Sequence, residues 1–216
     1  FSASTDGADN IAIGRSALAV SGNDGDTNIA IGLAALGTGD VAGAGNIGLG
    51  ASALTALTSG TNNIGVGLTS ADALLTGTDN IAIGRLSFSA STDGADNIAI
   101  GRSALAVSGN DGDTNIAIGL SALGTGDVAG AGNIGIGASA LAAVTSGTNN
   151  IGVGLTASDA LLSGTDNIAI GRLAFSASTD GADNIAIGRS ALAVSGNDGD
   201  TNIAIGLAAL GTGDVA

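Results

Sequence analysis

Several residue types on which most enzyme chemistry depends are absent from this 216-residue chain. It has no histidine, cysteine, lysine or glutamate, so its 19 acidic residues are all aspartate and its 5 basic residues are all arginine. General bases near neutral pH are mostly histidine or tuned glutamate and lysine, and thiolate nucleophiles require cysteine. Zinc and copper sites lack their usual ligands for the same reason. The composition predicts a protein that is not an enzyme, with no catalytic and no cofactor-binding residues.

Positive charge is scarce, and the net charge is −14 at pH 7. Nucleic acids and anionic membranes are recognised by clustered lysine and arginine, so neither is an expected partner. A membrane-spanning helix needs about 20 mostly apolar residues. Glycine, serine, threonine and asparagine interrupt every apolar stretch of this chain. We therefore expect no membrane insertion of this segment.

Repetition is what the chain has in abundance. The segment Asn-Ile-Ala-Ile-Gly, or a close variant, recurs twelve times at spacings of 17 or 18 residues. Five such units form an 87-residue super-repeat, which gives the blocks 1–87, 88–174 and a partial third block, 175–216. We expect residues 1–216 to be a single continuous array and a window of a longer fibre. The units begin at Asn10, Asn28, Asn46, Asn63, Asn80, Asn97, Asn115, Asn133, Asn150, Asn167, Asn184 and Asn202.

One unit cannot bury a core by itself, and it contains too much glycine for a helix. The alternation over residues 11–13 predicts a short strand, the apolar run around Leu18 predicts a second one, and a turn rich in Gly and Asp follows. Stacked units of this kind form an all-β parallel β-solenoid, or β-roll, with one 17–18-residue rung per unit and about 12 rungs. Leucines displaced toward the end of residues 68–75 predict a bulge or a displaced corner there. The expected core residues of the second strand are Leu18, Leu36, Leu54, Phe88, Leu105, Leu123, Leu141 and Phe175.

The residue between the two strand isoleucines is alanine or glycine in every unit. We expect the isoleucines to point into the core and the small residue to point away from it, because side chains alternate along a strand. A solvated face would accept larger polar residues, so this restriction indicates a close-packed interface between chains; duplication of a harmless alanine is the alternative. The candidate interface residues are Ala12, Ala30, Gly48, Gly65, Ala82, Ala99, Ala117, Gly135, Gly152, Ala169, Ala186 and Ala204.

An asparagine precedes each strand and a glycine follows it. The asparagine amide is expected to bond to backbone or to the equivalent asparagine one rung away. The glycine is expected to form a corner with positive φ.

The turn Asn-Asp-Gly-Asp at residues 23–26 recurs twice, and it resembles the first half of a calcium loop without the later bidentate glutamate. Stacked turns would bring several carboxylates together, so Ca²⁺ is the only candidate cofactor. The alternative is a solvated acidic turn. The candidate metal ligands are Asp24, Asp26, Asp111, Asp113, Asp198 and Asp200.

Residues 9–19, Asp-Asn-Ile-Ala-Ile-Gly-Arg-Ser-Ala-Leu-Ala, resemble the head repeats of YadA-like trimeric autotransporter adhesins. Similar repeats occur in other bacterial surface fibres and in phage tail fibres. The resemblance covers all twelve units, although the family's rungs are shorter and typically place serine where this chain has asparagine. It implies a left-handed β-roll, a homotrimer, and a non-enzymatic binding surface or spacer.

We therefore expect a structural segment of an extracellular fibre or filament, on a cell-surface appendage or a virion tail fibre. It would serve as an adhesin-type shaft or head, a spacer or an attachment surface. Its expected partner is the chain itself, with a host-surface or matrix molecule as a further candidate. The alternative is a calcium-dependent binding module or an ice-binding solenoid, although the threonines are irregularly placed for the latter.

Overall fold

The computed structural model describes residues 7–19, 24–107, 112–193 and 199–211, which form strands and turns and contain no helix. The chain divides into two compact units, Phe1–Asp111 and Gly112–Ala216, and each is considered by itself. Every repeat contributes one three-residue strand at the predicted position. The first unit contains β1 (Ile11–Ile13), β2 (Ile29–Ile31), β3 (Ile47–Leu49), β4 (Ile64–Val66), β5 (Ile81–Ile83) and β6 (Ile98–Ile100). The second contains β7 (Ile116–Ile118), β8 (Ile134–Ile136), β9 (Ile151–Val153), β10 (Ile168–Ile170), β11 (Ile185–Ile187) and β12 (Ile203–Ile205).

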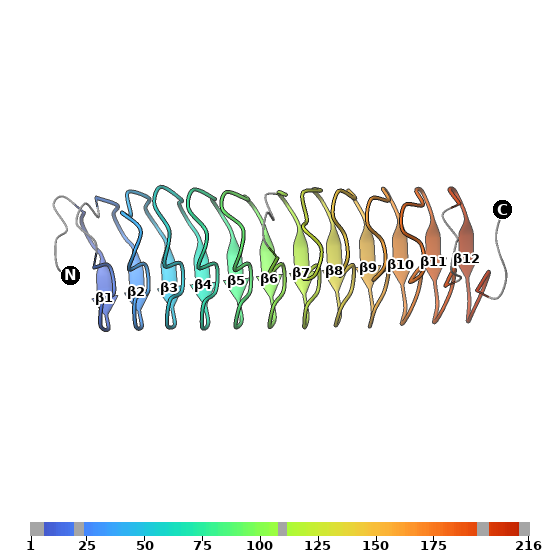
Figure 1. Cartoon of the computed structure of the whole chain (residues 1–216), viewed down its shortest axis with the longest axis horizontal. Helices are drawn as coiled ribbons and strands as arrows, with labels where there is room; N and C mark the ends of the chain where they lie inside the picture. The colour runs from blue at the N-terminus through green and yellow to red at the C-terminus, as the bar shows by residue number, and fades with distance from the viewer. Residues whose placement is uncertain (1–6, 20–23, 108–111, 194–198, 212–216) are drawn as a thin grey trace. The chain divides into compact units, whose positions relative to one another are not determined.

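Within each unit the strands pair in parallel and in chain order, so that successive turns of the chain stack on one another (Figure 1). Ala12 pairs with Ala30, and Ala30 pairs with Gly48, which places equivalent residues of successive repeats in one column. The same unshifted register runs from β7 to β12. The prediction of an all-β parallel solenoid with one rung per repeat is confirmed, while its handedness and the number of associated chains stay predictions.

Each strand ends at a glycine corner. Gly14 has φ 132° and Gly32 has φ 139°, in a region that residues with a side chain rarely adopt. A Cβ atom on Gly14 would also collide with the carbonyl oxygen of Gly32 in the next rung. The predicted role of this glycine is confirmed.

The apolar run after the corner forms a turn, and the prediction of a second strand was wrong. Ser16 and Leu18 have φ values of 58° and 43°, and two left-handed residues so close together cannot belong to an extended strand. A left-handed conformation costs an ordinary residue about 1–2 kcal/mol. The bond from Leu18 N to Ala35 O, at 3.1 Å, is among those that hold this turn against the next rung.

Side chains from this turn fill most of the core. The predicted residues Leu18, Leu36, Leu54, Phe88, Leu105, Leu123, Leu141 and Phe175 are all at most 1% exposed, which confirms their placement. A second apolar column, nearer the end of each rung, contains the fully buried Val41, Leu57, Leu74, Val128, Val144 and Leu161. The core is therefore built mainly from turn residues rather than from the strands.

The bulge expected over residues 68–75 is absent. Thr69 and Ala71 have φ values of 50° and 47°, close to those of Ser52 and Leu54 in the preceding rung. Leu74 N donates to Ala71 O at 3.3 Å, as Leu57 N donates to Leu54 O. The backbone is therefore unchanged, and Leu74 occupies the same column as Leu57 while the small Ala71 takes the place of the leucine.

The asparagines before the strands form a buried ladder along each unit. The Oδ1 atom of Asn63 accepts from the backbone N and from Nδ2 of Asn80, at 3.1 and 3.0 Å. Its Nδ2 donates to Asn46 Oδ1 at 3.1 Å and to Gly77 O at 2.7 Å. The predicted bond between equivalent asparagines is confirmed, and every polar atom of this buried amide has a partner.

Candidate functional site

The two faces of each strand lie the opposite way round from the prediction. Ala82 and Ala99 are 0% exposed, whereas Ile83 is 38% exposed. The reason is the width of the core: a Cβ atom on Gly65 would lie only 2.9 Å from Cγ of Leu54. Because the turn leucines already fill this space, the strand contributes a residue no larger than alanine.

The assignment of these small residues to an interface between chains was therefore wrong. A side chain enclosed by its own chain cannot touch a second one. All are buried except Ala12 in the first rung, which is half-buried. The core residues concerned are Ala12, Ala30, Gly48, Gly65, Ala82, Ala99, Ala117, Gly135, Gly152, Ala169, Ala186 and Ala204.

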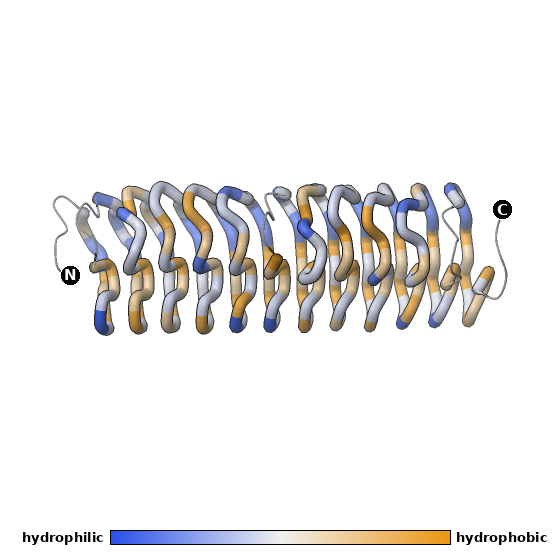
Figure 2. Tube along the Cα trace, viewed as in Figure 1, coloured by the Kyte–Doolittle hydropathy of each residue, from blue (hydrophilic) through white to orange (hydrophobic). Residues whose placement is uncertain are grey.

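The outer side of each sheet is instead a continuous apolar surface, which we call the isoleucine face. It consists of the first and third residues of every strand, all of which are isoleucine, leucine or valine. Their side chains are half-buried or exposed, with 40% exposure at Ile170 and up to 67% at Ile205 in the last rung. Figure 2 shows hydrophobic segments that recur in successive rungs of each unit.

One edge of the isoleucine face is formed by the residue that follows the corner glycine. This residue is leucine, alanine or arginine, and Leu68 and Leu155 are 50% and 49% exposed. Six strands spaced about 4.8 Å apart and three residues of extended chain give the isoleucine face of one unit an area of about 300 Å². Exposed apolar patches of this size commonly mark interaction sites.

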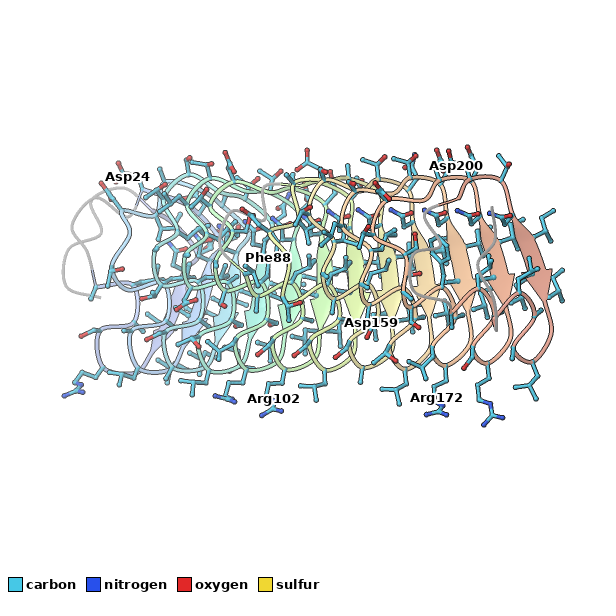
Figure 3. All side chains as sticks on the ribbon, turned by 45° about the vertical axis from the view of Figure 1, so that its right-hand side comes forward. Asp24, Phe88, Arg102, Asp159, Arg172 and Asp200 are labelled. Atoms are coloured by element: carbon cyan, nitrogen blue, oxygen red, sulfur yellow. The ribbon has the colours of Figure 1, made fainter. Side chains whose placement is uncertain are left out.

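The two edges of the isoleucine face carry opposite charges. All five arginines occupy the edge after the corner glycine and are exposed: Arg15, Arg85, Arg102, Arg172 and Arg189. The opposite edge is formed by the residue just before the asparagine, which is exposed except at Gly45 and Gly132 and is aspartate in five rungs. Figure 3 shows Arg102 and Arg172 projecting on the side of their units away from Asp24 and Asp200.

The candidate calcium ligands are not gathered into a site in the part of the chain that the structure describes. No group of three or more potential ligands occurs there. Asp26 Oδ1 accepts from Ala8 N at 2.7 Å, and Asp200 Oδ1 accepts from Ala182 N at 2.8 Å. These carboxylates therefore bond to the backbone of the preceding rung. Asp24 and Asp113 are exposed, and Asp111 and Asp198 lie outside the described residues.

Two equivalent aspartates in the turns have perturbed acidity. Burial raises the pKa of Asp72 and of Asp159, and a backbone hydrogen bond partly offsets this effect. The Oδ1 atom of Asp72 is buried without a hydrogen-bond partner, as is the hydroxyl of Ser158. No pocket opens beside them in the described residues.

Sequence reasoning missed the isoleucine face because alternation does not say which side of a strand is inside. A usable signal was the large apolar residue eight positions after the asparagine, which is leucine or phenylalanine in ten of the twelve units, since it already supplied a core column opposite the strand. With that column in place, only the smaller strand residue fits inside.

Comparisons with known proteins identify no relative. No family model matches the chain, and no curated protein or solved structure resembles it significantly. Among the described residues there is no helix long and apolar enough to cross a membrane.

Proposed function

We propose that this chain is a non-enzymatic structural segment of an extracellular fibre, on a cell-surface appendage or a virion tail fibre. It works as a homotrimer in which the isoleucine faces of three copies pack around a common axis. The likeness of residues 9–19 to adhesin head repeats supports this assembly, and so does the stacking of rungs in each unit. A host-surface or matrix ligand would bind the outer turns.

The observation that carries the proposal is an exposed surface that stays aliphatic. The outer strand positions are isoleucine, leucine or valine in all twelve rungs. The rungs have diverged elsewhere, since the residue before each asparagine is Asp, Thr, Gly or Asn. Copying by duplication alone would have left both columns equally uniform, so the apolar columns are accounted for by a partner that covers them.

The mechanical role follows from the bonds between rungs. Each strand is bonded to its neighbours along the backbone, and the asparagine ladder adds buried bonds beside it. A parallel ladder of this kind resists pulling along the stack because many bonds must break together. The net charge of −14 disfavours lateral aggregation of finished fibres.

Sedimentation equilibrium tests the proposal directly. A trimer of the 20.0 kDa chain has a mass of about 60 kDa, three times 20.0. Ile83→Lys with Ile170→Lys, one change on each unit's isoleucine face, is expected to reduce this mass to that of a single chain, because it places ammonium groups in the apolar contact.

Two exposed leucines away from the isoleucine face provide a matched control. Leu75 and Leu162 are 39% and 41% exposed, close to Ile83 and Ile170 at 38% and 40%. Leu75→Lys with Leu162→Lys is expected to leave the trimer intact. A mass of about 20 kDa for the unaltered chain would refute the proposed assembly.

A further inference from the structure

The charges at the two edges of the isoleucine face are matched rung by rung. Wherever the edge after the corner glycine carries arginine, the residue before the asparagine of that same rung is aspartate. In every other rung both positions are uncharged, and they combine Thr with Leu, Gly with Ala, or Asn with Leu. The charged pairs are Asp9 with Arg15, Asp79 with Arg85, Asp96 with Arg102, Asp166 with Arg172, and Asp183 with Arg189.

The two members of a pair are too far apart to bind each other within one chain. They are six residues apart across a strand, which corresponds to about 20 Å of extended backbone. They border opposite edges of the face, and both are exposed. Stacking does not bring them closer, because equivalent residues of successive rungs remain in their own columns.

We propose that neighbouring copies pack in parallel and in the same register, with the arginine edge of one copy lying along the aspartate edge of the next. The partner at these edges is a second copy of this chain. This inference rests on the proposed self-association through the isoleucine face, and it adds the direction and the register of the copies.

Symmetry limits the arrangements that can make this contact. When copies are related by rotation about an axis parallel to the stack of rungs, the right edge of one face meets the left edge of its neighbour. Each arginine then faces the aspartate of the equivalent rung. An antiparallel, face-to-face pair would instead bring arginine edge to arginine edge and aspartate edge to aspartate edge. The segregation of charge therefore selects the parallel arrangement.

The distribution of charged rungs also selects the register. In the first unit, the rungs of β1, β5 and β6 are charged. An unshifted contact pairs all three arginines with aspartates, whereas a shift of one rung pairs only one, since only β5 and β6 are adjacent. The other charges would then face leucine, threonine or asparagine without compensation. Mispairing of this kind disfavours the wrong register.

The aspartates are already oriented for such a contact. Asp79 Oδ1 accepts a hydrogen bond from Asn62 Nδ2 at 3.1 Å, and Asp166 Oδ1 accepts one from Asn149 Nδ2 at 3.2 Å. Each bond fixes a carboxylate through one of its two oxygens at the rim of the apolar face. A guanidinium from a neighbouring copy would find a planar acceptor there, partly shielded from water.

Disulfide trapping tests direction and register together, because the chain contains no cysteine of its own. The variant Asp96→Cys with Arg102→Cys places two thiols in one rung about 20 Å apart. A disulfide needs Cα atoms within about 7 Å, so the two thiols cannot join within a chain. Oxidation is expected to link most of the protein into a covalent trimer that reduction dissolves.

Two variants serve as controls. Arg102→Cys alone is expected to remain unlinked, and disulfide dimers of it would overturn the parallel arrangement. Asp96→Cys with Arg15→Cys separates the thiols by five rungs, and efficient linkage of that variant would overturn the unshifted register. If the reduced protein sediments as a trimer but the same-rung pair does not link, this inference fails while the proposed function stands. A single-chain mass under reducing conditions refutes the proposed function itself.

A charge exchange provides a second measurement that does not depend on cysteine. Arg102→Asp alone and Asp96→Arg alone are each expected to weaken the trimer by about tenfold or more, because like charges then meet at the contact. The two changes in one chain are expected to recover most of the loss. Additive weakening in the double variant, with circular dichroism unchanged, would overturn the inference.

Discussion

The inner and outer columns of one rung follow different rules although their residues are neighbours in the sequence. Asn63 is fully buried and its column is asparagine throughout, whereas the exposed Asn62 beside it belongs to a column of Asp, Thr, Gly and Asn. In the strand, Ala82 is enclosed while Ile83 is 38% exposed. The inner columns are constrained by the rungs above and below. The isoleucine columns also stack on the rungs above and below, but their outer side is open to solvent in one chain, which is why we assign them a partner.

The largest expected difference between inner and outer columns comes from introducing aspartate at two neighbouring positions, Asn63 in a buried column and Asn62 in an exposed one. In Asn63→Asp, the new oxygen replaces Nδ2 and faces Asn46 Oδ1 and Gly77 O, which were its acceptors. Oδ1 keeps its two donors from Asn80, but the new oxygen of the buried carboxylate faces only acceptors, which is expected to cost about 3–5 kcal/mol of unfolding free energy. Urea denaturation of the chain measures the loss.

Asn62→Asp is the matched control, because aspartate occupies the same column at Asp79 and Asp96. The change removes the exposed bond from Asn62 Nδ2 to Asp79 Oδ1 and places two solvated carboxylates side by side, so it is expected to cost no more than about 1 kcal/mol. Equal effects at the two positions would show that the asparagine ladder contributes nothing specific.

The size of the side chains within one strand provides a second test, with a smaller expected effect on stability. Ala82→Leu inserts three carbon atoms into a space bounded by the turn side chains, and it is expected to cost about 1–3 kcal/mol. Ile83→Leu, on the outer side of the same strand, is expected to change the stability of the single chain by less than about 0.5 kcal/mol. Thermal unfolding at a protein concentration at which the trimer is dissociated compares the stability of the two variants. A larger loss of stability in Ile83→Leu than in Ala82→Leu would contradict the assigned faces.

The periodic features of this fold could be predicted from sequence, and the orientation of its strands could not. Twelve units, the glycine corner at Gly14, the bond between successive asparagines and the burial of Leu18 each follow from local chemistry repeated at fixed spacing. The strand orientation depends on how wide the core is, which is set by residues across the rung. A rule that places isoleucine inside and alanine outside fails when leucine already fills the interior.

The turn segments show a second reason why predictions from the sequence were wrong. Alternation around Leu18 favoured a strand, but its left-handed φ of 43° is imposed by bonding to the next rung, which no single repeat encodes. The same is true of residues 68–75, where a displaced leucine indicated a bulge. The stacked backbone keeps its path there, and the column that receives Leu74 already exists in the previous rung as Leu57.

The smallest expected effect concerns two half-buried aspartates in the turns, Asp72 and Asp159. Burial raises the pKa of Asp72 and Asp159, so folding favours their protonated form. Their contribution to stability is greatest below the unfolded pKa of about 3.9 and is lost as the pH rises through the higher folded pKa. Asp72→Asn with Asp159→Asn is therefore expected to stabilise the chain at pH 7 by up to about 1 kcal/mol, allowing for partial solvation.

The advantage of this double variant is expected to disappear when the pH is lowered below about 4, where the aspartates of the unaltered chain are protonated in both states. Asp40→Asn with Asp127→Asn, at equivalent exposed positions, controls for the general effect of removing negative charge. Denaturation midpoints measured from pH 3 to pH 7 for the three proteins give the comparison. A stabilisation by the Asp72 and Asp159 changes that persists unchanged at pH 3 would show that it arises from packing of the amide rather than from the buried charge.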